Sequence, residues 1–192
     1  MNGCICCTVH GDLTETLDRM YDRIRDFDGV LIETTGLADP APVAQTFFVD
    51  DRVSQRYKLD GIVTVVDAKH VVRHIEEEKP EGVENEAVEQ LAFADRIMLN
   101  KIDLVSGEEL KEVEKTIKSI NGFAPIYHTE NSIIDPKNLI NIGSFDLERT
   151  LEMDPEFLDT DSEHEHDQRV TSTSARFEGE LNVPILACIR GD

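Results

Sequence analysis

Three cysteines stand close together near the start of the chain, at Cys4, Cys6 and Cys7. Thiolates are soft ligands that select zinc or copper(I), and three of them can close on one ion where the backbone turns. Because neighbouring residues of a strand point to opposite faces, we expect a loop at Cys6 and Cys7. Three ligands would leave one tetrahedral position for water, a carboxylate or a partner, which suits a carrier. The alternatives are buried free cysteines and a thiol redox pair.

A second candidate site is the segment Asn100-Lys101-Ile102-Asp103, which directly follows an apolar run. The carboxylate of Asp103 can accept hydrogen bonds from the ring N–H and the exocyclic amine of guanine, whereas adenine presents no such pair of donors. Asn100 can bond the base edge or tie neighbouring loops together, and the stem of Lys101 can lie along the ring face. The pattern predicts a guanine-binding loop, and the alternative is an ordinary polar turn.

The segment Glu33-Thr34-Thr35-Gly36 also closes an apolar run. A carboxylate at Glu33 could hold the magnesium of a nucleotide through water, and Gly36 leaves room for its backbone N–H to approach a terminal phosphate. The alternative is a strand that ends in an ordinary turn.

Two histidines, His164 and His166, alternate with acidic residues in the stretch 154–169. They could scavenge metal, but such a run more often forms a flexible solvated tether, and we interpret it as a linker. We interpret Cys188 as an incidental thiol.

The bulk composition bounds the function. A chain of 192 residues with 40% hydrophobic content can bury one sizeable core. Its formal charge of −21 would repel nucleic acid and anionic membranes, so we expect neither as a partner. The apolar runs are far shorter than the roughly 20 residues that span a bilayer, no secretory signal is visible, and clustered thiols suit a reduced compartment. We therefore expect a cytoplasmic protein.

The elements that must position these residues alternate between strands and helices. Runs rich in branched apolar residues predict buried parallel strands at 30–32, 62–66 and 96–99, and a fourth strand is expected at about 124–128. Helical spacing predicts helices at 12–25, from Pro40 through Phe48, at 84–94, and from a capping box of Ser106 and Glu109 to Asn121. The pattern predicts an α/β fold with a doubly wound, mostly parallel sheet.

Several of these strands are followed by polar side chains, among them Glu33, Asp67 and Asp103. Ligands of open parallel sheets bind at the carboxyl edge, so we expect these side chains to gather at one edge with the cysteines beside them. We expect residues 1–153 to form the nucleotide-binding domain and residues 170–192 to begin a second, truncated domain.

With these motifs in order and at this spacing, the chain resembles the CobW-like family of metal-chaperone GTPases. Within that family it is most similar to the eukaryotic zinc-regulated GTPase metalloprotein activators, over residues 2 to about 134. The matching segments are Gly3-Cys4-Ile5-Cys6-Cys7, Glu33-Thr34-Thr35-Gly36-Leu37-Ala38-Asp39-Pro40, Leu59-Asp60-Gly61-Ile62-Val63-Thr64-Val65-Val66-Asp67 and Asn100-Lys101-Ile102-Asp103-Leu104-Val105.

The resemblance implies a P-loop NTPase core that couples binding and hydrolysis of GTP to metal transfer, with GTP, Mg²⁺ and Zn²⁺ as ligands. It assigns Cys4, Cys6 and Cys7 to the metal-binding CxCC motif and Glu33 to the magnesium side, with Gly36 closing that motif.

It assigns Asn100, Lys101 and Asp103 to the guanine loop. It also implies a client metalloprotein as partner, and for the zinc-regulated branch that client is a methionine aminopeptidase.

The chain departs from the family pattern at its start. The family opens with a strand and a GxxGxGK[ST] phosphate loop, whereas here Met1-Asn2-Gly3 leads directly to the cysteines and no Gly-Lys-Ser/Thr follows. A phosphate loop supplies backbone donors and a lysine to the triphosphate. We therefore expect an N-terminally truncated sheet that lacks its first strand, with weak or no GTPase activity. A non-catalytic metal- or protein-binding fragment without GTPase activity and a thiol redox module remain as alternatives.

Overall fold

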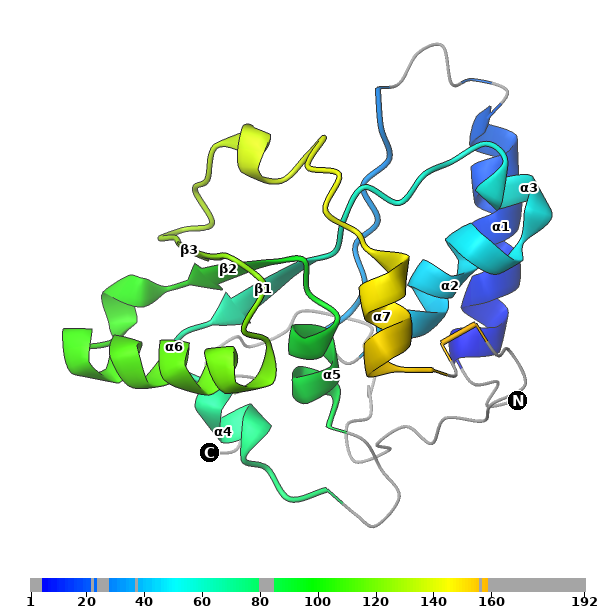
Figure 1. The fold of residues 1–192 in the computed structure, drawn as a ribbon. Coiled ribbons are helices and arrows are strands. Elements are labelled where there is room, and N and C mark those ends of the chain that lie inside the picture. The colour runs from blue at the N-terminus through cyan, green and yellow to red at the C-terminus, as the bar shows by residue number, and fades with distance from the viewer. Residues whose placement is uncertain are drawn as a thin grey trace, which may run out of the picture.

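A three-stranded parallel sheet forms the centre of the computed structural model (Figure 1). The structure describes residues 5–21, 23, 28–36, 38–79, 85–155 and 157–158, and for residues 5–10 and 153 the backbone alone. The strands β1 (Val63–Asp67), β2 (Arg96–Asn100) and β3 (Ile126–His128) lie in that order, and both neighbouring pairs are parallel. The predicted α/β fold with a parallel sheet is therefore confirmed, as are three of its four expected strands.

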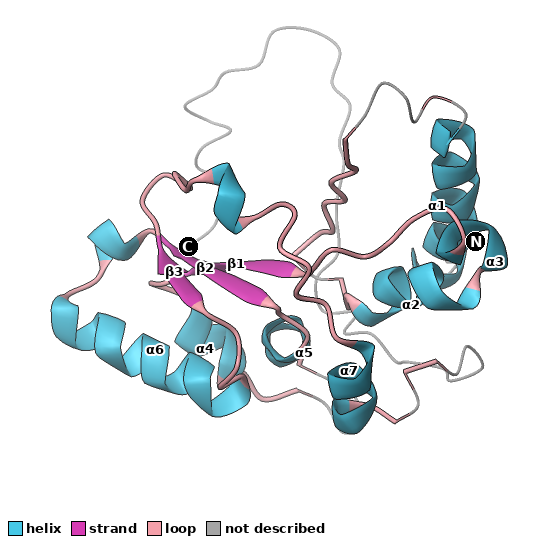
Figure 2. Ribbon diagram, turned by 45° about the horizontal axis from the view of Figure 1, so that its top comes forward, coloured by secondary structure: helices cyan, strands magenta, loops and turns pink. Residues whose placement is uncertain are grey.

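Three helices cover one face of this sheet: α4 (Val71–Ile75), α5 (Glu86–Ala92) and α6 (Gly107–Ile120) (Figure 2). Ile97 and Leu99 of β2 point into this layer and are fully buried, together with Ile117 of α6. Burial of a side chain of this size stabilises the fold by roughly 1.5–3 kcal/mol.

The start of α6 is fixed by its own sequence. The backbone N–H of Glu109 donates to Ser106 Oγ at 3.2 Å, and the N–H of Ser106 donates to Glu109 Oε2 at 2.6 Å. This capping box satisfies two N–H groups that the first helical turn leaves open. The predicted capping box is confirmed, and the loop after β2 consequently has a fixed end.

A second group of helices packs away from the sheet. It consists of α1 (Ile5–Tyr21), α2 (Ala41–Val49) and the short α3 (Asp51–Ser54). Leu17, Phe47 and Val53 form their buried core. A cluster that includes Phe48, Phe93 and Phe157 joins this group to the sheet layer and to α7 (Leu147–Met153). The other residues of this cluster are Ala41, Ala44, Leu59, Ile62, Phe145, Leu147 and Leu151.

The expected strand at 30–32 is wrong. Residues 28–35 have no regular secondary structure, and the side chain of Leu31 is 91% exposed. A strand exists only where a neighbour supplies hydrogen bonds, and β1 pairs with β2 alone among the described strands. An apolar run that reads as a buried strand therefore lies on the surface.

The first helix also differs from its prediction. It begins at Ile5 instead of Asp12, so Cys6 and Cys7 lie in a helical turn where a loop was expected. Asp12 is therefore an exposed residue within the helix and not its first residue. The prediction failed at this point because the spacing of apolar residues such as Leu17 shows which face of a helix is buried but not where the helix begins.

None of the described helices is long and apolar enough to cross a bilayer. The predicted linker at 154–169 lies largely outside the described residues, and the predicted second domain at 170–192 lies wholly outside them.

Candidate functional site

The carboxyl edge of the sheet brings together polar residues that follow different strands. Asp67 and Asn100 are register partners at the ends of β1 and β2. The N–H of Ala68 donates to the carbonyl oxygen of Asn100 at 3.0 Å, which holds the two strand ends together. The sequence predicted that the polar residues at the ends of these two strands lie at one edge of the sheet, and the pairing of β1 with β2 confirms it for Asp67 and Asn100.

Asn100 ties this edge to the turn that follows β3. Its Oδ1 accepts from the N–H of Ser132 at 2.9 Å and from Thr129 Oγ1 at 3.1 Å, and its Nδ2 donates to Ser132 Oγ at 2.9 Å. The side chain is buried and its bonds are used within the protein. Of the two roles open to Asn100 from the sequence, the structure shows that it ties neighbouring loops.

The turn that Asn100 holds has unusual backbone geometry. Asn131 and Ser132 adopt positive φ angles of 50° and 57°, a left-handed conformation that is uncommon for residues other than glycine, although asparagine is enriched in it. Sequence reasoning did not include Thr129 and Ser132 in the site. The signal that could have found them is their position, shortly after the predicted strand at 124–128.

Lys101 lies beside Asp67 in an ion pair. Its backbone is left-handed, with φ 62° and ψ 34°, and its Nζ lies 2.7 Å from Asp67 Oδ2. Nδ1 of His70 lies 3.1 Å from the same oxygen, and the N–H of Lys69 donates to Asp67 Oδ1 at 2.9 Å. Burial by itself raises the pKa of Asp67, but the hydrogen bonds from Lys101, His70 and Lys69 outweigh it and lower the pKa to about 2. Asp67 is therefore charged at neutral pH.

Asp103 has a different environment. It lies in the 3-10 helix η2 (Ile102–Leu104), which follows β2 directly. Its side chain is exposed, and within the described part of the chain its carboxylate has no hydrogen-bond or ion-pair partner. It is thus a free acceptor next to a rigid strand end, which is the arrangement that recognition of a pair of N–H donors requires.

Glu33 and Gly36 lie elsewhere. Nε2 of Gln90 donates to the carbonyl oxygens of Gly36 and Ala38, at 3.1 and 2.8 Å. The carbonyl of the same Gln90 accepts from Thr64 Oγ1 at 2.7 Å, near the amino end of β1. Figure 1 shows the segment before α2 passing beside the start of β1. Glu33, which belongs to this segment, is exposed. The structure does not bring Glu33 and Gly36 to the edge that carries Asn100, because their segment is not a strand.

The cysteine motif is separated from this edge as well. Cys4 lies outside the described residues, and Cys6 and Cys7 belong to the first turn of α1, where only the backbone is described. Figures 1 and 2 place α1 at the opposite end of the molecule from the carboxyl ends of the strands. Among the side chains that the structure describes, no three His, Cys, Asp or Glu residues form a cluster that could hold a metal ion.

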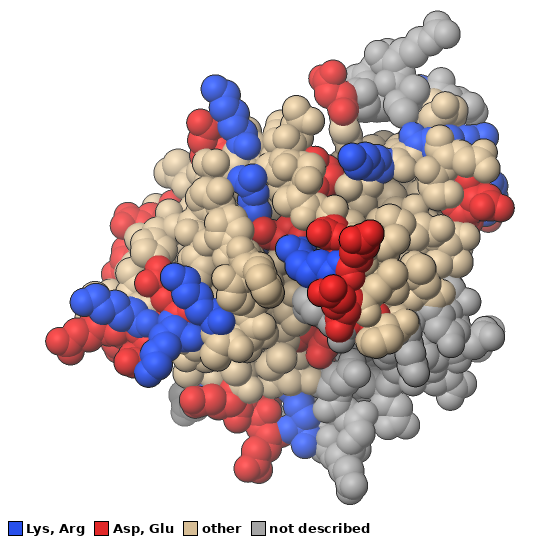
Figure 3. Space-filling view, viewed as in Figure 1, with Lys and Arg blue, Asp and Glu red and all other residues tan. Residues whose placement is uncertain are grey.

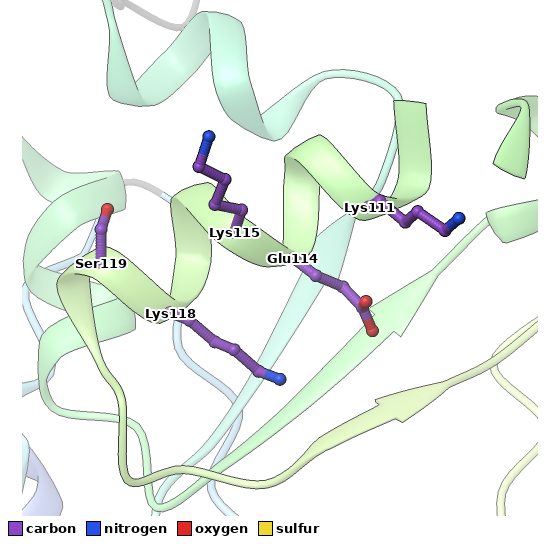
Figure 4. A pocket seen from close by; sticks show the side chains of 5 residues that line it. All are labelled: Lys111, Glu114, Lys115, Lys118 and Ser119. Carbon is purple, nitrogen blue, oxygen red and sulfur yellow. The ribbon is translucent and has the colours of Figure 1, made fainter. Parts of the chain in front are cut away.

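A surface depression of about 430 Å³ lies on α6, and all of its lining residues come from that one helix (Figure 4). Its lining residues are Lys111, Glu114, Lys115, Lys118 and Ser119. Basic side chains gather over this helix with acidic ones among them (Figure 3). The depression contains none of the predicted site residues, and a single helix face does not enclose a ligand.

About two thirds of the chain match a known protein family. The model of the CobW/HypB/UreG nucleotide-binding domain matches residues 1–128, which is more than half of the chain. The chain belongs to the CobW/HypB/UreG family. The matched region contains the whole three-stranded sheet, and with it Asp67, Asn100, Lys101 and Asp103.

Curated relatives agree with this family. The chain is 39% identical over 150 residues to zinc-regulated GTPase metalloprotein activator 1 of Schizosaccharomyces pombe, which covers 78% of the chain and 35% of that protein. It is 36% identical over 154 residues to the zinc chaperone YjiA of Escherichia coli, covering 78% of the chain and 46% of the relative.

A solved structure shares the fold. The crystal structure of Zn(II)-bound YjiA GTPase from E. coli superposes with a TM-score of 0.59 at 31% identity, over 86% of this chain and 44% of that one. The chain therefore spans between about a third and a half of the length of these CobW-family relatives.

Proposed function

We propose that this chain is part of a GTP-binding and GTP-hydrolysing metallochaperone that binds zinc and transfers it to a client metalloprotein. The observation that carries the proposal is the free carboxylate of Asp103, positioned next to Asn100 at the carboxyl edge of the sheet of a CobW/HypB/UreG domain. The names of the relatives support the GTPase and zinc parts of the proposal.

Recognition of the base follows from the donors of guanine. The two oxygens of Asp103 accept from the ring N–H and from the exocyclic amine, and both bonds are charge-assisted. Asn100 contributes by fixing the turn at Ser132 against the end of β2, while the aliphatic stem of Lys101 covers a ring face. Adenine offers no matching pair of donors, so the site selects guanine.

For the phosphate side we propose Glu33 and Gly36, with Mg²⁺ held by the Glu33 carboxylate through water. Glu33 is exposed and has no partner among the described residues, which fits the preference of Mg²⁺ for a carboxylate that leaves its water shell in place. A bound Mg²⁺ ion would neutralise part of the negative charge of the phosphates. In this structure Gln90 holds Gly36 near the amino end of β1, so this assignment requires the segment 30–36 to move toward the carboxyl edge.

For the metal we propose Cys4, Cys6 and Cys7 as ligands, with zinc as the cargo. Cys6 and Cys7 lie in the first turn of α1, and free N–H groups at a helix start favour the thiolate form that binds zinc. A reduced compartment, for which we propose the cytoplasm, keeps such thiols available. Resemblance to the zinc-regulated branch makes a methionine aminopeptidase the proposed client.

One observation favours a second candidate function, a binding module that does not hydrolyse GTP. The segment that carries Glu33 and the helix that carries Cys6 both lie away from Asp103 in this structure. Base recognition at the edge does not depend on either of them.

Calorimetry with GTP and Mg²⁺, followed by a phosphate-release assay, separates these functions. The proposal expects binding of GTP in preference to ATP, together with hydrolysis above the rate of the Glu33→Gln variant. Binding without hydrolysis would establish the second candidate. Absence of any preference for GTP over ATP would exclude both.

The zinc assignment has its own experiment. In a titration against a competing chelator, the triple variant Cys4→Ser, Cys6→Ser, Cys7→Ser is expected to lose zinc affinity, while Cys188→Ser serves as the matched control and keeps it. Equal affinity of the triple variant and the wild type would remove the three cysteines as ligands.

A further inference from the structure

Two opposite charges at the carboxyl edge stand two positions apart in the sequence but do not meet. Lys101 is the cation nearest to Asp103 along the chain. Its ammonium group nevertheless contacts Asp67, at 2.7 Å, and the carboxylate of Asp103 stays without a partner in the described part of the chain. The structure thus separates a pair that Coulomb attraction would otherwise bring together.

Asp67 is well fixed for this purpose. It ends β1 in register with Asn100, so its position relative to η2 is set by the sheet. One of its oxygens accepts from the N–H of Lys69 and the other faces His70 Nδ1 at 3.1 Å. These contacts orient the carboxylate toward Lys101 before any ligand arrives.

The backbone of Lys101 serves the same arrangement. Its left-handed conformation, φ 62°, turns the chain sharply between β2 and η2, and its carbonyl accepts from the N–H of Leu104 at 3.0 Å. The side chain leaves this turn toward β1, while Asp103 follows on the exposed 3-10 helix.

We infer that Asp67 is a positioning residue for guanine recognition: it holds the Lys101 ammonium away from Asp103 and so keeps that carboxylate free for the base. The inference rests on the proposed function. Without the charge of Asp67, Lys101 pairs with Asp103, and the base must compete with an internal cation for the same two oxygens. The ammonium group of Lys101 then weakens the preference for guanine over other bases, although the stem of Lys101 still covers a face of the base.

The test compares bases that differ only in the group that Asp103 reads. Hypoxanthine lacks the exocyclic amine of guanine, so the ratio of the dissociation constants for IDP and GDP reports the second hydrogen bond to Asp103. The full chain is titrated with GDP and IDP, up to millimolar concentration, by amide-resolved NMR. A charge-assisted hydrogen bond predicts that the wild type prefers GDP by about tenfold or more.

Asp67→Asn is expected to reduce this preference to about twofold or less, because a competing ammonium removes most of the charge-assisted bond. In the double variant Asp67→Asn, Lys101→Met the ammonium is gone and the stem is kept, so the preference returns toward the wild-type ratio. Asp50→Asn is the matched control: Asp50 caps the distant α3, the substitution removes the same charge, and the ratio stays at the wild-type value.

Far-UV circular dichroism shows whether each variant is folded. If Asp67→Asn fails to fold, Asp67→Ser replaces it: a serine hydroxyl can still accept from the N–H of Lys69 but carries no charge, so the same fall in the ratio is expected, and an unchanged ratio would overturn the inference. An unchanged ratio in a folded Asp67→Asn variant would overturn it as well, as would a double variant no better than the single. A wild type that shows no preference for GDP would refute the proposed function itself.

Discussion

Replacement of Arg149 by alanine is expected to destabilise the protein strongly, because it leaves the buried carboxylate of Asp95 without a counterion. The side chain of Asp95 is fully buried, whereas Arg149 is 27% exposed. Asp95 Oδ2 accepts from the N–H of Ile62 at 2.8 Å, and its Oδ1 pairs with Arg149 Nη2. The pair joins the start of β2 to α7, so its loss affects both parts of the core.

The magnitude follows from the desolvation of Asp95. Removal of one partner of a buried ion pair costs about 3–5 kcal/mol, and the remaining bond from Ile62 favours the lower end, about 3 kcal/mol at pH 7.5. For a chain of this size that loss lowers the midpoint of thermal unfolding by roughly 6–12 °C. Urea unfolding followed by far-UV circular dichroism measures it, since the chain contains no tryptophan.

The pH dependence of this variant supplies a second check. Burial raises the pKa of Asp95, although the bonds from Ile62 and Arg149 favour its charged form. Loss of Arg149 raises this pKa further. A folded-state pKa above the unfolded one means that the folded state binds the extra proton, so stability increases as the pH falls through the folded-state pKa toward the unfolded-state pKa. The difference between Arg149→Ala and the wild type is therefore expected to shrink between pH 7.5 and pH 5.

Arg52→Ala is the matched control, because Arg52 pairs with Asp50 at 3.2 Å but is 57% exposed. Exposed pairs contribute about 0–1 kcal/mol, so this variant should unfold within that range of the wild type. Equal and small effects of Arg52→Ala and Arg149→Ala would refute the reasoning from burial.

Three further predictions concern stability and are all measured by urea unfolding. The pKa of Asp67 is lowered from its ordinary 3.8 to about 2, so the stabilisation by the charged carboxylate is present above about pH 4 and is lost as the pH falls through 2. The full shift corresponds to about 2.5 kcal/mol, and solvent screening of the half-exposed Lys101 reduces this to about 1 kcal/mol. The variant Asp67→Asn should not show this loss of stability in acid. Asn121→Ala leaves buried groups unpaired, among them the carbonyl of Ala94 that accepts from Nδ2 at 2.8 Å, and should cost about 2–4 kcal/mol, whereas a cost under 0.5 kcal/mol would contradict it. Gly61→Ala places a methyl group 2.7 Å from Ile142 Cδ1, the flexible end of a side chain, so a cost of about 1 kcal/mol is expected, and a neutral or stabilising result would contradict the contact.

Local signals made part of this structure predictable. The capping box at Ser106 lies within four residues, and the runs that became β1 and β2 are continuous apolar segments with polar ends. Such features are decided by neighbours in the sequence. The edge position of Asp67 and Asn100 followed from them, because parallel strands end at one edge.

Other parts depend on contacts that a sequence does not display. The run at 30–32 has the composition of a strand, but a strand needs a partner, and in the described part of the chain β1 has one neighbour only. The role of Asn100 depends on Ser132, which lies 32 positions away. The packing of α1 on α2 and α3 likewise depends on tertiary contacts, those of Leu17 with Phe47 and Val53.

We propose that Asp103 binds guanine, and replacement of its carboxylate by an amide puts this proposal to the test. Xanthine carries a carbonyl oxygen where guanine has its amine, so it requires a donor where guanine requires an acceptor. An amide supplies one of each. The account predicts that Asp103→Asn lowers the affinity for GDP by about tenfold or more and raises the affinity for XDP, measured side by side with the wild type by calorimetry. Unchanged affinities for both nucleotides in a folded Asp103→Asn protein would show that this carboxylate does not contact the base.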